Sequence, residues 1–554
     1  MKEPWIKSFG DLPFHLQYSD LTMSAKVLET AAADPDFTAL SFMGRKIKYA
    51  TLADNIDKVA RAFYNIGVRP GQRVMVCMPN VPQAVYCLYA LNRIGAVATM
   101  VHPLSAVGEI EFYLNEAQCD VAVTLDQFYA KFCDVRARRP IGKLIIASLS
   151  DELPFIKRVF YRLTTERKFP KAVDAILWKD FLKGASAVTD GYVAAKDCHT
   201  EAVVLFSGGT TGTTKGIMLS DLNFNALALQ TATMSHYEIR HTKMLAAMPV
   251  FHGFGLGVCI HTMMYCGGTS ILVPRFNVKS YAALIKENKP NFIAGVPTLF
   301  EGITRNKYLD GVDLSCLKGV FSGGDSLTIE LKKKFDAFLA DHKATIRVRE
   351  GYGTTECVTA SCLTPWDHEK EGSIGIPFPD TYYQICAVGT NEEVPYGTEG
   401  EICLSGPSVM LGYINHEQEN ADTLRVHEDG RVWLHTGDLG VMDDEGFIYF
   451  RQRIKRMIVT SGYNVYPSQL ENILEQHPAV RRSCVIGIPD PYKMQAVKAF
   501  VVLADGYEDT LEVRESIMAH CREHIAKYAM PKVLEVRDSL PTTLVGKVAY
   551  TQLS

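Results

Sequence analysis

The chain has 554 residues, which corresponds to three or four units at roughly 150 residues per domain. Hydrophobic residues make up 47% and charged residues 22%, an ordinary globular composition that excludes a mainly disordered chain. The 58 Lys and Arg residues against 62 Asp and Glu residues give a net charge of −4. This balance leaves no basic field for wrapping nucleic acid, so we expect no nucleic-acid partner.

The 14 cysteines are scattered along the chain and form no CxxC pair. Cys357 and Cys362 lie close together but have no matched second pair, so we predict no zinc site. The N-terminus lacks the apolar core of a signal peptide. No run approaches the ~18 uninterrupted apolar residues of a membrane span. The sequence therefore predicts a cytoplasmic protein with buried free thiols.

Short apolar runs alternate with helical patterns through most of the chain. They predict a helix over 83–94 and strands over 74–78, 96–101, 121–125, 144–147, 202–206, 244–248, 270–273 and 291–295. This alternation favours an α/β fold with parallel sheets covered on both faces.

Residues 151–186 combine basic and aromatic side chains. The basic ones are Lys157, Arg158, Arg162, Arg167, Lys168 and Lys171, and the aromatic ones are Phe155, Phe160, Tyr161 and Phe169. Such a segment can lie weakly on an anionic membrane surface. The alternative, a solvated excursion beside a domain, is the one we favour from the sequence.

The pattern changes after about residue 381. Short strands with Gly and Pro turns predict a small, barrel-like β subdomain over about 381–450, which ends with a strand at 447–451. The last hundred residues predict a small α+β domain, with helices over 468–476 and 513–525 and strands over 483–488 and 496–502.

The strongest motif follows the predicted strand 202–206. It reads Ser207, Gly208, Gly209, Thr210, Thr211, Gly212, Thr213, Thr214, Lys215, Gly216. Glycines let the backbone N–H groups surround an anion, and the hydroxyls and Lys215 add donors. The usual P-loop pattern is excluded, because Lys215 is not followed by Ser or Thr. The motif predicts phosphate binding, with a plain connecting turn as the alternative.

A second motif is Glu350, Gly351, Tyr352, Gly353, Thr354, Thr355, Glu356. Tyr352 offers a flat face to a base, Thr355 can donate to a phosphate, and Glu356 is a hard oxygen ligand suited to Mg²⁺. A strand-end turn is the alternative. Upstream, Phe321 to Asp325 forms another tight turn at a strand end, where α/β sheets place their ligands.

Three later motifs are weaker alone. Asp438, after Trp433 to Gly437, could accept two hydrogen bonds from a ribose diol, although an Asx turn is common there. The basic run Arg453 to Arg456 precedes Ser461, Gly462 and Tyr463. Lys547 stands near the C-terminus, where a lysine is usually solvated.

In this order and at these spacings, the motifs resemble the adenylate-forming (AMP-binding) superfamily of acyl-CoA synthetases, luciferases and peptide-synthetase adenylation domains. The match runs from about Phe9 to Leu553. Adjacent stretches agree as well: Pro249–Gly255, Gly397–Ile402, Gly412–Tyr413, Pro467 with Glu471, and Leu540–Thr542. The Ser-Gly-Gly-Thr-Thr-Gly form of the loop resembles the fatty acyl-CoA ligases most.

This resemblance implies that ATP activates a carboxylic acid, expected to be a fatty acid, to acyl-AMP with release of pyrophosphate. Coenzyme A then accepts the acyl group. In the implied ATP site, Ser207 to Lys215 bind the β- and γ-phosphates, and Thr355 and the catalytic Lys547 lie at the α-phosphate. The adenine is bordered by Gly324, Asp325 and Tyr352, with Gly353 and Thr354 beside them. The catalytic Glu356 binds Mg²⁺, and Asp438 with Arg453 holds the ribose.

It also implies a large domain, 1–453, and a mobile lid domain, 454–554, that rotates about a hinge at Lys455. Rotation would bring Ser461, Gly462 and Tyr463 to the CoA tunnel. His252, with Phe251, Gly255 and Gly295, is implied to border the acyl pocket. A satisfied core histidine is the alternative for His252.

Four residues depart from the family pattern: Thr214, Gln452, Gln469 and Tyr550. None removes an implied catalytic group, so we expect an active acid–thiol ligase. The alternatives left open are an acyl-AMP ligase that loads a separate carrier protein, an aryl or short-chain acid:CoA ligase, an inactive nucleotide-binding relative and a luciferase-type monooxygenase. A homodimer is also left open, as are the chain length of the acid and the pathway.

Overall fold

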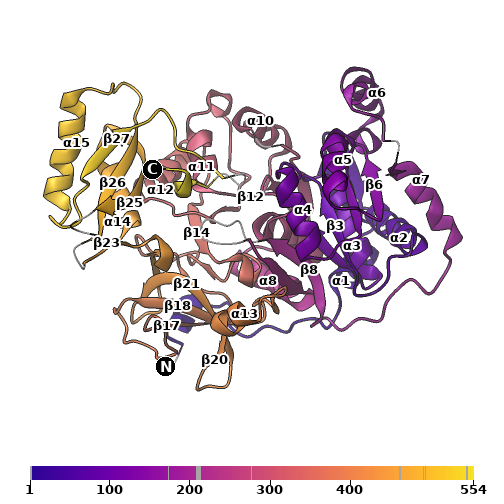
Figure 1. Cartoon of the computed structure of the whole chain (residues 1–554), viewed down its shortest axis with the longest axis horizontal. Helices are drawn as coiled ribbons and strands as arrows, with labels where there is room; N and C mark the ends of the chain where they lie inside the picture. The colour runs from indigo at the N-terminus through magenta and orange to yellow at the C-terminus, as the bar shows by residue number, and fades with distance from the viewer. Residues whose placement is uncertain are drawn as a thin grey trace.

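The structure is a computed structural model of the whole chain. It describes residues 3–172, 174–206, 214–275, 277–460, 463–490, 492, 494–543 and 547–553, with the backbone alone at 463 and 464. Figure 1 shows a large body built from about the first four fifths of the chain, with a smaller C-terminal unit, in yellow, packed at one end.

One sheet holds the strands nearest the N-terminus. Among the described residues its order is β19 (Gly412–Tyr413), β9 (Gly216–Ser220), β8 (Glu201–Phe206), β4 (Val97–Met100), β3 (Arg73–Cys77), β5 (Val121–Leu125), β6 (Lys143–Ala147) and β7 (Ile176–Leu177). From β8 to β7 the strands run parallel. Val74 and Val76 pack into one core cluster and Met75 and Cys77 into another, so β3 is buried on both faces.

A second sheet continues the α/β pattern. Its described order is β16 (Ile376–Pro377), β15 (Cys362–Leu363), β14 (Val348–Tyr352), β13 (Gly319–Ser322), β12 (Phe292–Gly295), β10 (Lys243–Ala246), β11 (Thr269–Leu272), β1 (Thr38–Phe42) and β2 (Arg45–Lys48). The strands from β14 to β1 are parallel. These two sheets confirm the predicted α/β class.

Helices cover both sheets (Figure 1). Their bounds are α1 Met23–Ala33, α2 Tyr49–Asn65, α3 Pro82–Arg93, α4 Val107–Glu116, α5 Tyr129–Arg138, α6 Phe155–Thr164, α7 Trp178–Lys183, α8 Asp221–Met234, α9 Thr262–Cys266, α10 Val278–Asn288, α11 Pro297–Thr304 and α12 Ile329–Asp341. A π-helix, Phe254–His261, runs directly into α9.

The β-rich part is an antiparallel sheet. Its described strands are β17 (Tyr382–Cys386), β18 (Gly400–Ser405), β21 (Val432–Met442) and β20 (Leu424–Val426), with β22 (Ile448–Arg453) paired to β21, and the short helix α13 (Glu417–Thr423) precedes β20. Asp438 and Arg453 are register partners in β21 and β22, so the sheet itself brings these two residues together.

The C-terminal unit has its own sheet and core. The described strands are β24 (Tyr463–Val465), β23 (Ile458–Thr460), β26 (Met494–Leu503), β25 (Val480–Asp490) and β27 (Val533–Val536), and the helices are α14 (Pro467–Gln476) and α15 (Leu511–His524). Leu474 and Ile517, one from each helix, are fully buried in the core cluster of this unit. The arrangement confirms the predicted smaller α+β C-terminal domain.

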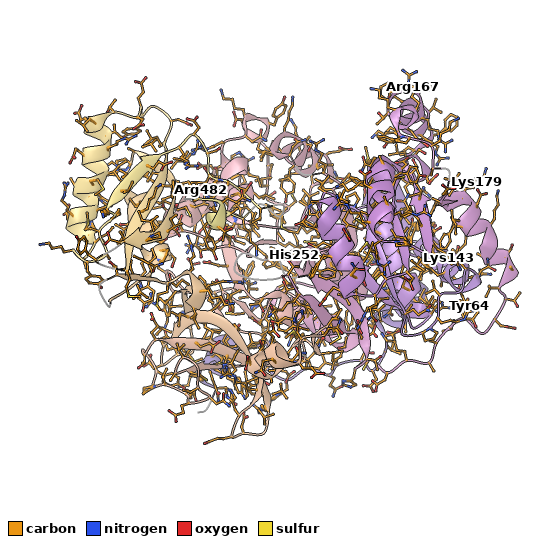
Figure 2. All side chains as sticks on the ribbon, viewed as in Figure 1. Tyr64, Lys143, Arg167, Lys179, His252 and Arg482 are labelled. Carbon is orange, nitrogen blue, oxygen red and sulfur yellow. The ribbon has the colours of Figure 1, made fainter. Side chains whose placement is uncertain are left out.

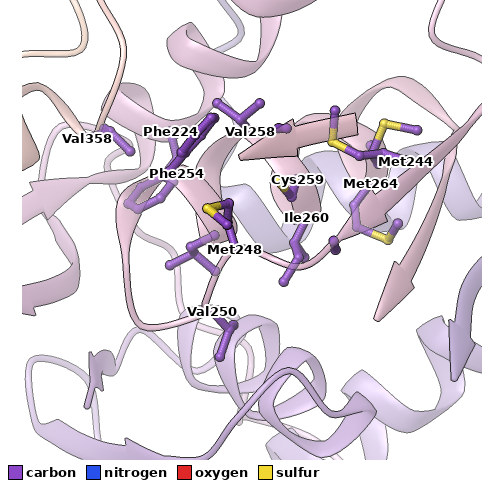
Figure 3. Close-up of a cluster of buried hydrophobic side chains, with 14 of the residues drawn as sticks. Phe224, Met244, Met248, Val250, Phe254, Val258, Cys259, Ile260, Met264 and Val358 are labelled. Carbon is purple, nitrogen blue, oxygen red and sulfur yellow. The ribbon is translucent and has the colours of Figure 1, made fainter. Parts of the chain in front are cut away.

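The main core continues between the sheets. Figure 3 shows Phe224 of α8, Phe254 and Val258 of the π-helix and Met244 of β10 among the buried side chains that join them. Gly255 allows the turn before the π-helix to close, because a Cβ there would lie 2.1 Å from the carbonyl oxygen of Pro249. The core thus fixes the segment that carries Phe251 and His252.

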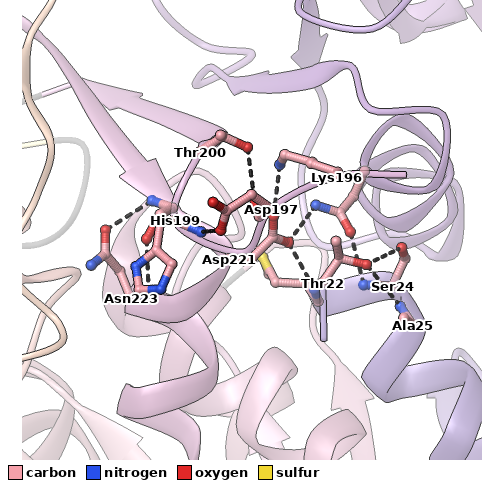
Figure 4. Close-up of polar contacts among 12 residues, drawn as sticks. Thr22, Ser24, Ala25, Lys196, Asp197, His199, Thr200, Asp221 and Asn223 are labelled. Atoms are coloured by element: carbon pink, nitrogen blue, oxygen red, sulfur yellow. Dashed lines mark hydrogen bonds and ion pairs between the residues drawn. The ribbon is translucent and has the colours of Figure 1, made fainter. Parts of the chain in front are cut away.

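A buried aspartate ties the N-terminal segment to α8. Asp221 Oδ1 accepts hydrogen bonds from Met23 N at 2.7 Å and Asn92 Nδ2 at 2.6 Å, and Oδ2 pairs with Lys196 Nζ at 2.6 Å (Figure 4). A buried carboxylate needs such partners to offset its desolvation.

In the described part of the chain, no helix is both long enough and apolar enough to cross a membrane.

Candidate functional site

A cavity of about 690 Å³ lies where the second sheet, the β-rich sheet and the C-terminal unit meet. The sequence-predicted residues on its wall are Phe251, His252, Gly324, Asp325, Tyr352, Gly353, Thr354, Thr355, Glu356, Asp438, Arg453 and Lys547. Figure 2 marks His252 at the centre of the molecule. Residues separated by up to 296 positions, from Phe251 to Lys547, therefore share one enclosure.

Asp438 is the most buried carboxylate of the group, with a side chain only 3% exposed. Tyr352 donates its hydroxyl hydrogen bond to Oδ2 at 2.7 Å, and Arg453 Nε lies 3.4 Å from Oδ1. Burial raises the pKa of Asp438, and the Arg453 guanidinium opposes that rise. The carboxylate is therefore held in a fixed orientation that can accept hydrogen bonds from a diol.

Glu356 lies in a short 3₁₀ turn, Thr355–Cys357, directly after β14. Its Oε1 accepts a hydrogen bond from the Tyr413 hydroxyl at 2.9 Å. Its own backbone carbonyl accepts from Met410 N at 2.8 Å. The turn and Tyr413 together point a carboxylate into the cavity, where it can act as a hard oxygen ligand.

Lys547 enters the cavity from the C-terminal unit. Its Cε lies 3.5 Å from the position a Cβ would take on Gly324, whose φ is +81°. Asp325 Oδ2 accepts a hydrogen bond from Val548 N at 3.4 Å, which joins the C-terminal segment carrying Lys547 to the turn after β13. Burial lowers the pKa of Lys547, and Asp325 partly offsets this effect.

His252 faces the same space. Burial, and then the charge of Lys547, lower the pKa of His252 to about 3, so its imidazole is neutral near pH 7. Its Nδ1 accepts from Phe254 N at 3.2 Å. The neighbouring Phe251 ring stacks obliquely on His102, with centroids 4.1 Å apart. The remaining face of His252 can therefore offer only a neutral polar contact to a ligand.

Gly255 and Gly295 are not among the described residues that line the cavity. A Cβ on Gly295 would lie 3.1 Å from the methyl groups of Leu299, so this glycine serves packing, as Gly255 does. A small apolar cavity of about 40 Å³ lies next to Gly324 instead. Its walls include Phe254, Val258 and Phe321.

Several predicted residues lie outside the described part of the chain: Ser207, Gly208, Gly209, Thr210, Thr211, Gly212 and Thr213, together with Ser461, Gly462 and the side chain of Tyr463. Thr214 is described and lines the cavity. Lys215 Nζ lies 3.7 Å from Glu419 Oε1 and 4.7 Å from the centre of the Tyr413 ring. Tyr413 thus contacts both Lys215 and Glu356.

The predicted hinge residue lies between two anchored arginines. On one side Arg453 contacts Asp438. On the other, Arg456 binds Glu471 of α14 and lies 3.4 Å from the carbonyl oxygen of Val485. Lys455 itself is exposed. The backbone at Lys455 therefore joins a segment fixed to the large body to one fixed to the C-terminal unit.

The sequence assigned no role to two groups that support this site. Glu401 of β18 accepts from Gly437 N at 2.9 Å and contacts His435, which fixes the part of β21 that directly precedes Asp438. Glu301 of α11 contacts Arg482 at 3.2 Å and Arg481 at 3.6 Å, joining the large body to the C-terminal unit (Figure 2). Glu401 lay within a stretch that matched the family; only the fold reveals its partner, as it does for Glu301.

Two family models match the chain. The model described as AMP-binding enzyme covers residues 27–414, and the model described as AMP-binding enzyme C-terminal domain covers residues 469–547. The first alone spans more than half of the chain.

Curated relatives match over nearly the whole length. A long-chain-fatty-acid–CoA ligase of Bacillus subtilis (strain 168) is 34% identical and covers 100% of this chain and 98% of its own. A feruloyl-CoA synthase of Amycolatopsis sp is 30% identical over 94% of this chain and 95% of its own. ATP-bound MatB from Rhodopseudomonas palustris superimposes with a TM-score of 0.83 at 23% identity, over 97% of this chain and 98% of its own, which shows a shared fold.

Proposed function

The chain belongs to the family of AMP-binding enzymes, and we propose that it is an AMP-forming ligase that joins a fatty acid to coenzyme A. In the first step a carboxylic acid reacts with ATP to give acyl-AMP and pyrophosphate. In the second step the thiol of coenzyme A takes the acyl group and AMP is released. Full-length relatives named as CoA ligases support both steps.

One observation carries the proposal: Asp438, Glu356 and Lys547, from three parts of the chain, line a single cavity. A nucleoside triphosphate needs a partner for its ribose, ligands for its counter-ion and a cation near the reacting phosphorus. These three residues, with Tyr352 and Arg453 around Asp438, provide that set of groups.

In adenylation an oxygen of the substrate carboxylate bonds to the α-phosphorus, and the bond from this phosphorus to the bridging oxygen of pyrophosphate breaks. Like charges approach each other in this step, so cations placed beforehand lower the barrier. We assign this role to Lys547. Asp325 stabilises the lysine's position through its hydrogen bond from Val548 N. His252, being neutral, borders the acid without adding charge.

We propose Glu356 as the Mg²⁺ ligand. A single carboxylate, oriented by Tyr413, suits this ion, which usually takes one or two protein carboxylates together with substrate phosphates. When bound, the ion neutralises phosphate charge. We also propose the segment Ser207 to Lys215 as the phosphate-binding loop, on its sequence and on the position of Thr214 at the cavity wall.

For the second step we propose that the chain divides into 1–453 and 454–554 and turns about Lys455. The support is the exposure of Lys455 between the anchored Arg453 and Arg456. Rotation would withdraw Lys547 and bring Ser461, Gly462 and Tyr463 to the thiol.

We further propose a cytoplasmic location, which the free state of the cysteines supports.

An assay with a panel of acids tests which acid the enzyme takes. Relatives named for long-chain fatty acids favour a fatty acid, whereas the relative named feruloyl-CoA synthase supports an aryl acid as second candidate. Purified protein with Mg-ATP would be given acetate, octanoate, oleate, benzoate and ferulate, each with and without coenzyme A. Acyl-CoA and AMP formed from octanoate or oleate would support the proposal.

Other outcomes would contradict parts of it. Turnover of ferulate or benzoate alone would identify an aryl-acid ligase. Acyl-AMP that accumulates whether or not coenzyme A is present, and that is transferred to a phosphopantetheinylated carrier, would identify a carrier-loading enzyme. No AMP from any acid would overturn the assignment.

A further inference from the structure

Helix α6, Phe155–Thr164, projects from the end of the molecule that lies opposite the C-terminal unit (Figure 1). Its apolar side chains are unusually exposed: Ile156 81%, Phe155 75%, Phe160 69%, Leu163 62% and Val159 43%. At positions i, i+1, i+4, i+5 and i+8 they share one helix face. Single exposed apolar residues are ordinary, but a contiguous stripe marks an interaction surface.

The opposite face of α6 is tied to the protein by polar groups. Arg158 Nη2 donates to the carbonyl oxygen of Leu153 at 3.2 Å, and Arg162 Nε donates to Ser150 Oγ at 3.2 Å. Tyr161 is half-buried and packs against the main core. An ordinary surface helix buries its apolar stripe, whereas α6 directs it outward. The local hydrogen bonds therefore hold the stripe away from the protein core.

Basic side chains lie within the helix and directly after it. Lys157 Nζ donates to the carbonyl oxygen of Met43, itself 43% exposed in the turn between β1 and β2. Arg167, Lys168 and Lys171, just after the helix, are exposed (Figure 2 marks Arg167). We call the α6 stripe with these four basic residues the α6 patch.

We propose that the α6 patch binds the surface of a bilayer that contains anionic lipid. The helix has 10 residues, too few to span a bilayer but enough to lie in its interface with the apolar face inward. The basic residues then face anionic headgroups. A two-fold contact between copies of the chain would place these like charges against each other, which disfavours a second copy as the partner.

This inference rests on the proposed function for its purpose. Long-chain fatty acids partition into bilayers, so an enzyme that lies on the bilayer meets its acid there. No residue of the patch lines the cavity that holds Lys547, Asp438 and Glu356, so binding to vesicles can be measured with neither ATP nor acid present. Failure of membrane binding is therefore distinguishable from failure of the ligase assignment.

The test uses the full chain in co-sedimentation with vesicles of phosphatidylcholine alone and of phosphatidylcholine mixed equally with phosphatidylglycerol. We expect binding to the mixed vesicles that weakens as salt is raised. The double variant Ile156→Glu/Phe160→Glu should reduce the partition coefficient by about tenfold or more. Leu511→Glu is the matched control, because Leu511 is 78% exposed on α15. It should bind like the parent.

A second variant tests the charges. Lys168→Glu/Lys171→Glu should weaken binding to mixed vesicles by roughly tenfold while leaving the weak binding to neutral vesicles unchanged. All variants should retain the parent's melting temperature and its turnover of octanoate in solution. Absence of vesicle binding by the parent, or equal loss in Leu511→Glu, would overturn the proposal. So would concentration-dependent dimerisation that the α6 variants abolish, since the partner would then be a second copy.

Discussion

Glu401 Oε2 lies 2.9 Å from His435 Nδ1, while Oε1 of the same carboxylate accepts a hydrogen bond from Gly437 N at 2.9 Å. Both contacts lie on the irregular part of β21 that directly precedes Asp438. His435 Nε2 in turn lies 3.0 Å from His427 Nε2. A buried carboxylate thus fixes the backbone that presents the proposed ribose-binding group.

This contact predicts a specific defect in Glu401→Gln. The amide keeps the shape but loses the charge, so this part of β21 should loosen and the KM for ATP should rise several-fold with a smaller change in kcat. A hydrogen bond to a charged group contributes roughly 1.5–3 kcal/mol, so the melting temperature should also fall. Glu392→Gln, at an exposed position in the connection between β17 and β18, is the control and should behave like the parent.

The same variant has a predicted pH signature. Burial would raise the pKa of Glu401, but the hydrogen bonds from His435 and Gly437 N outweigh it, so this pKa lies below its usual value. A lowered carboxyl pKa stabilises the fold above the unfolded-state value, and that stability is lost as pH falls through the folded-state value. Glu401→Gln should therefore show a smaller loss of melting temperature in acid. An unchanged acid dependence would contradict the proposed positioning role.

Tyr352→Phe should weaken ATP binding without disturbing the aromatic face. The hydroxyl group donates a hydrogen bond to Asp438 Oδ2 at 2.7 Å, and its loss removes this hydrogen bond from a buried carboxylate. We expect the KM for ATP to rise about fivefold to tenfold, equivalent to ~1–1.4 kcal/mol, with kcat little changed. Isothermal titration with ATP measures the effect. Tyr49→Phe is the comparison, because the Tyr49 hydroxyl donates to the carbonyl oxygens of Met263 and Gly268 and does not line the cavity.

Lys547→Met separates catalysis from stability. Removing the cation should slow acyl-AMP formation by ~10²- to 10³-fold while ATP binding persists. Because burial lowers the pKa of Lys547, the protonated amine is less favourable in the folded state, and its removal should not lower the melting temperature at neutral pH. Near-normal adenylation by this variant would refute the assignment.

The parent enzyme should also lose adenylation activity as the pH rises. Because burial lowers the pKa of Lys547, this lysine loses its proton at a lower pH than an exposed lysine does. Titration of His252 should not change the activity near neutral pH, because the pKa of His252 is about 3. A pH profile of single-turnover acyl-AMP formation checks both expectations. Lys547→Arg should shift the alkaline limb to higher pH, whatever its rate.

Much of the fold could be predicted because a short run of apolar residues indicates a buried strand or helix. The strand predicted over 121–125 coincides with β5. The strand predicted over 244–248 ends earlier, at Ala246. There the amide of Asn80, distant in sequence, takes over by donating to the carbonyl oxygens of Ala246 and Met248 at 2.9 and 2.8 Å. No local pattern contains that partner.

The site shows the same division. Motif residues such as Asp438 and Lys547 could be selected from the sequence by their resemblance to a family, since their types and spacing are local features. The partners that orient the site carboxylates, Glu401 beside Asp438 and Tyr413 on Glu356, required the fold. The outward direction of the α6 stripe also required it, because periodicity identifies a helix face but not the side on which the protein lies.

The last prediction concerns the balance between the two half-reactions. Glu301 contacts Arg481 and Arg482, so it holds the C-terminal unit in the arrangement that places Lys547 in the cavity. Glu301→Gln should weaken this arrangement and slow acyl-AMP formation by severalfold, with less effect on thioester formation from acyl-AMP supplied directly.

Lys455→Pro should have the opposite effect and slow thioester formation more, because a fixed φ at the proposed hinge hinders rotation away from the arrangement. Rapid-quench measurements of each step would show two opposite selective defects. Equal slowing of both steps in either variant would contradict a hinge at Lys455 and a holding role for Glu301. Lys333→Gln, which removes an exposed ion pair on α12, provides the control for charge loss alone.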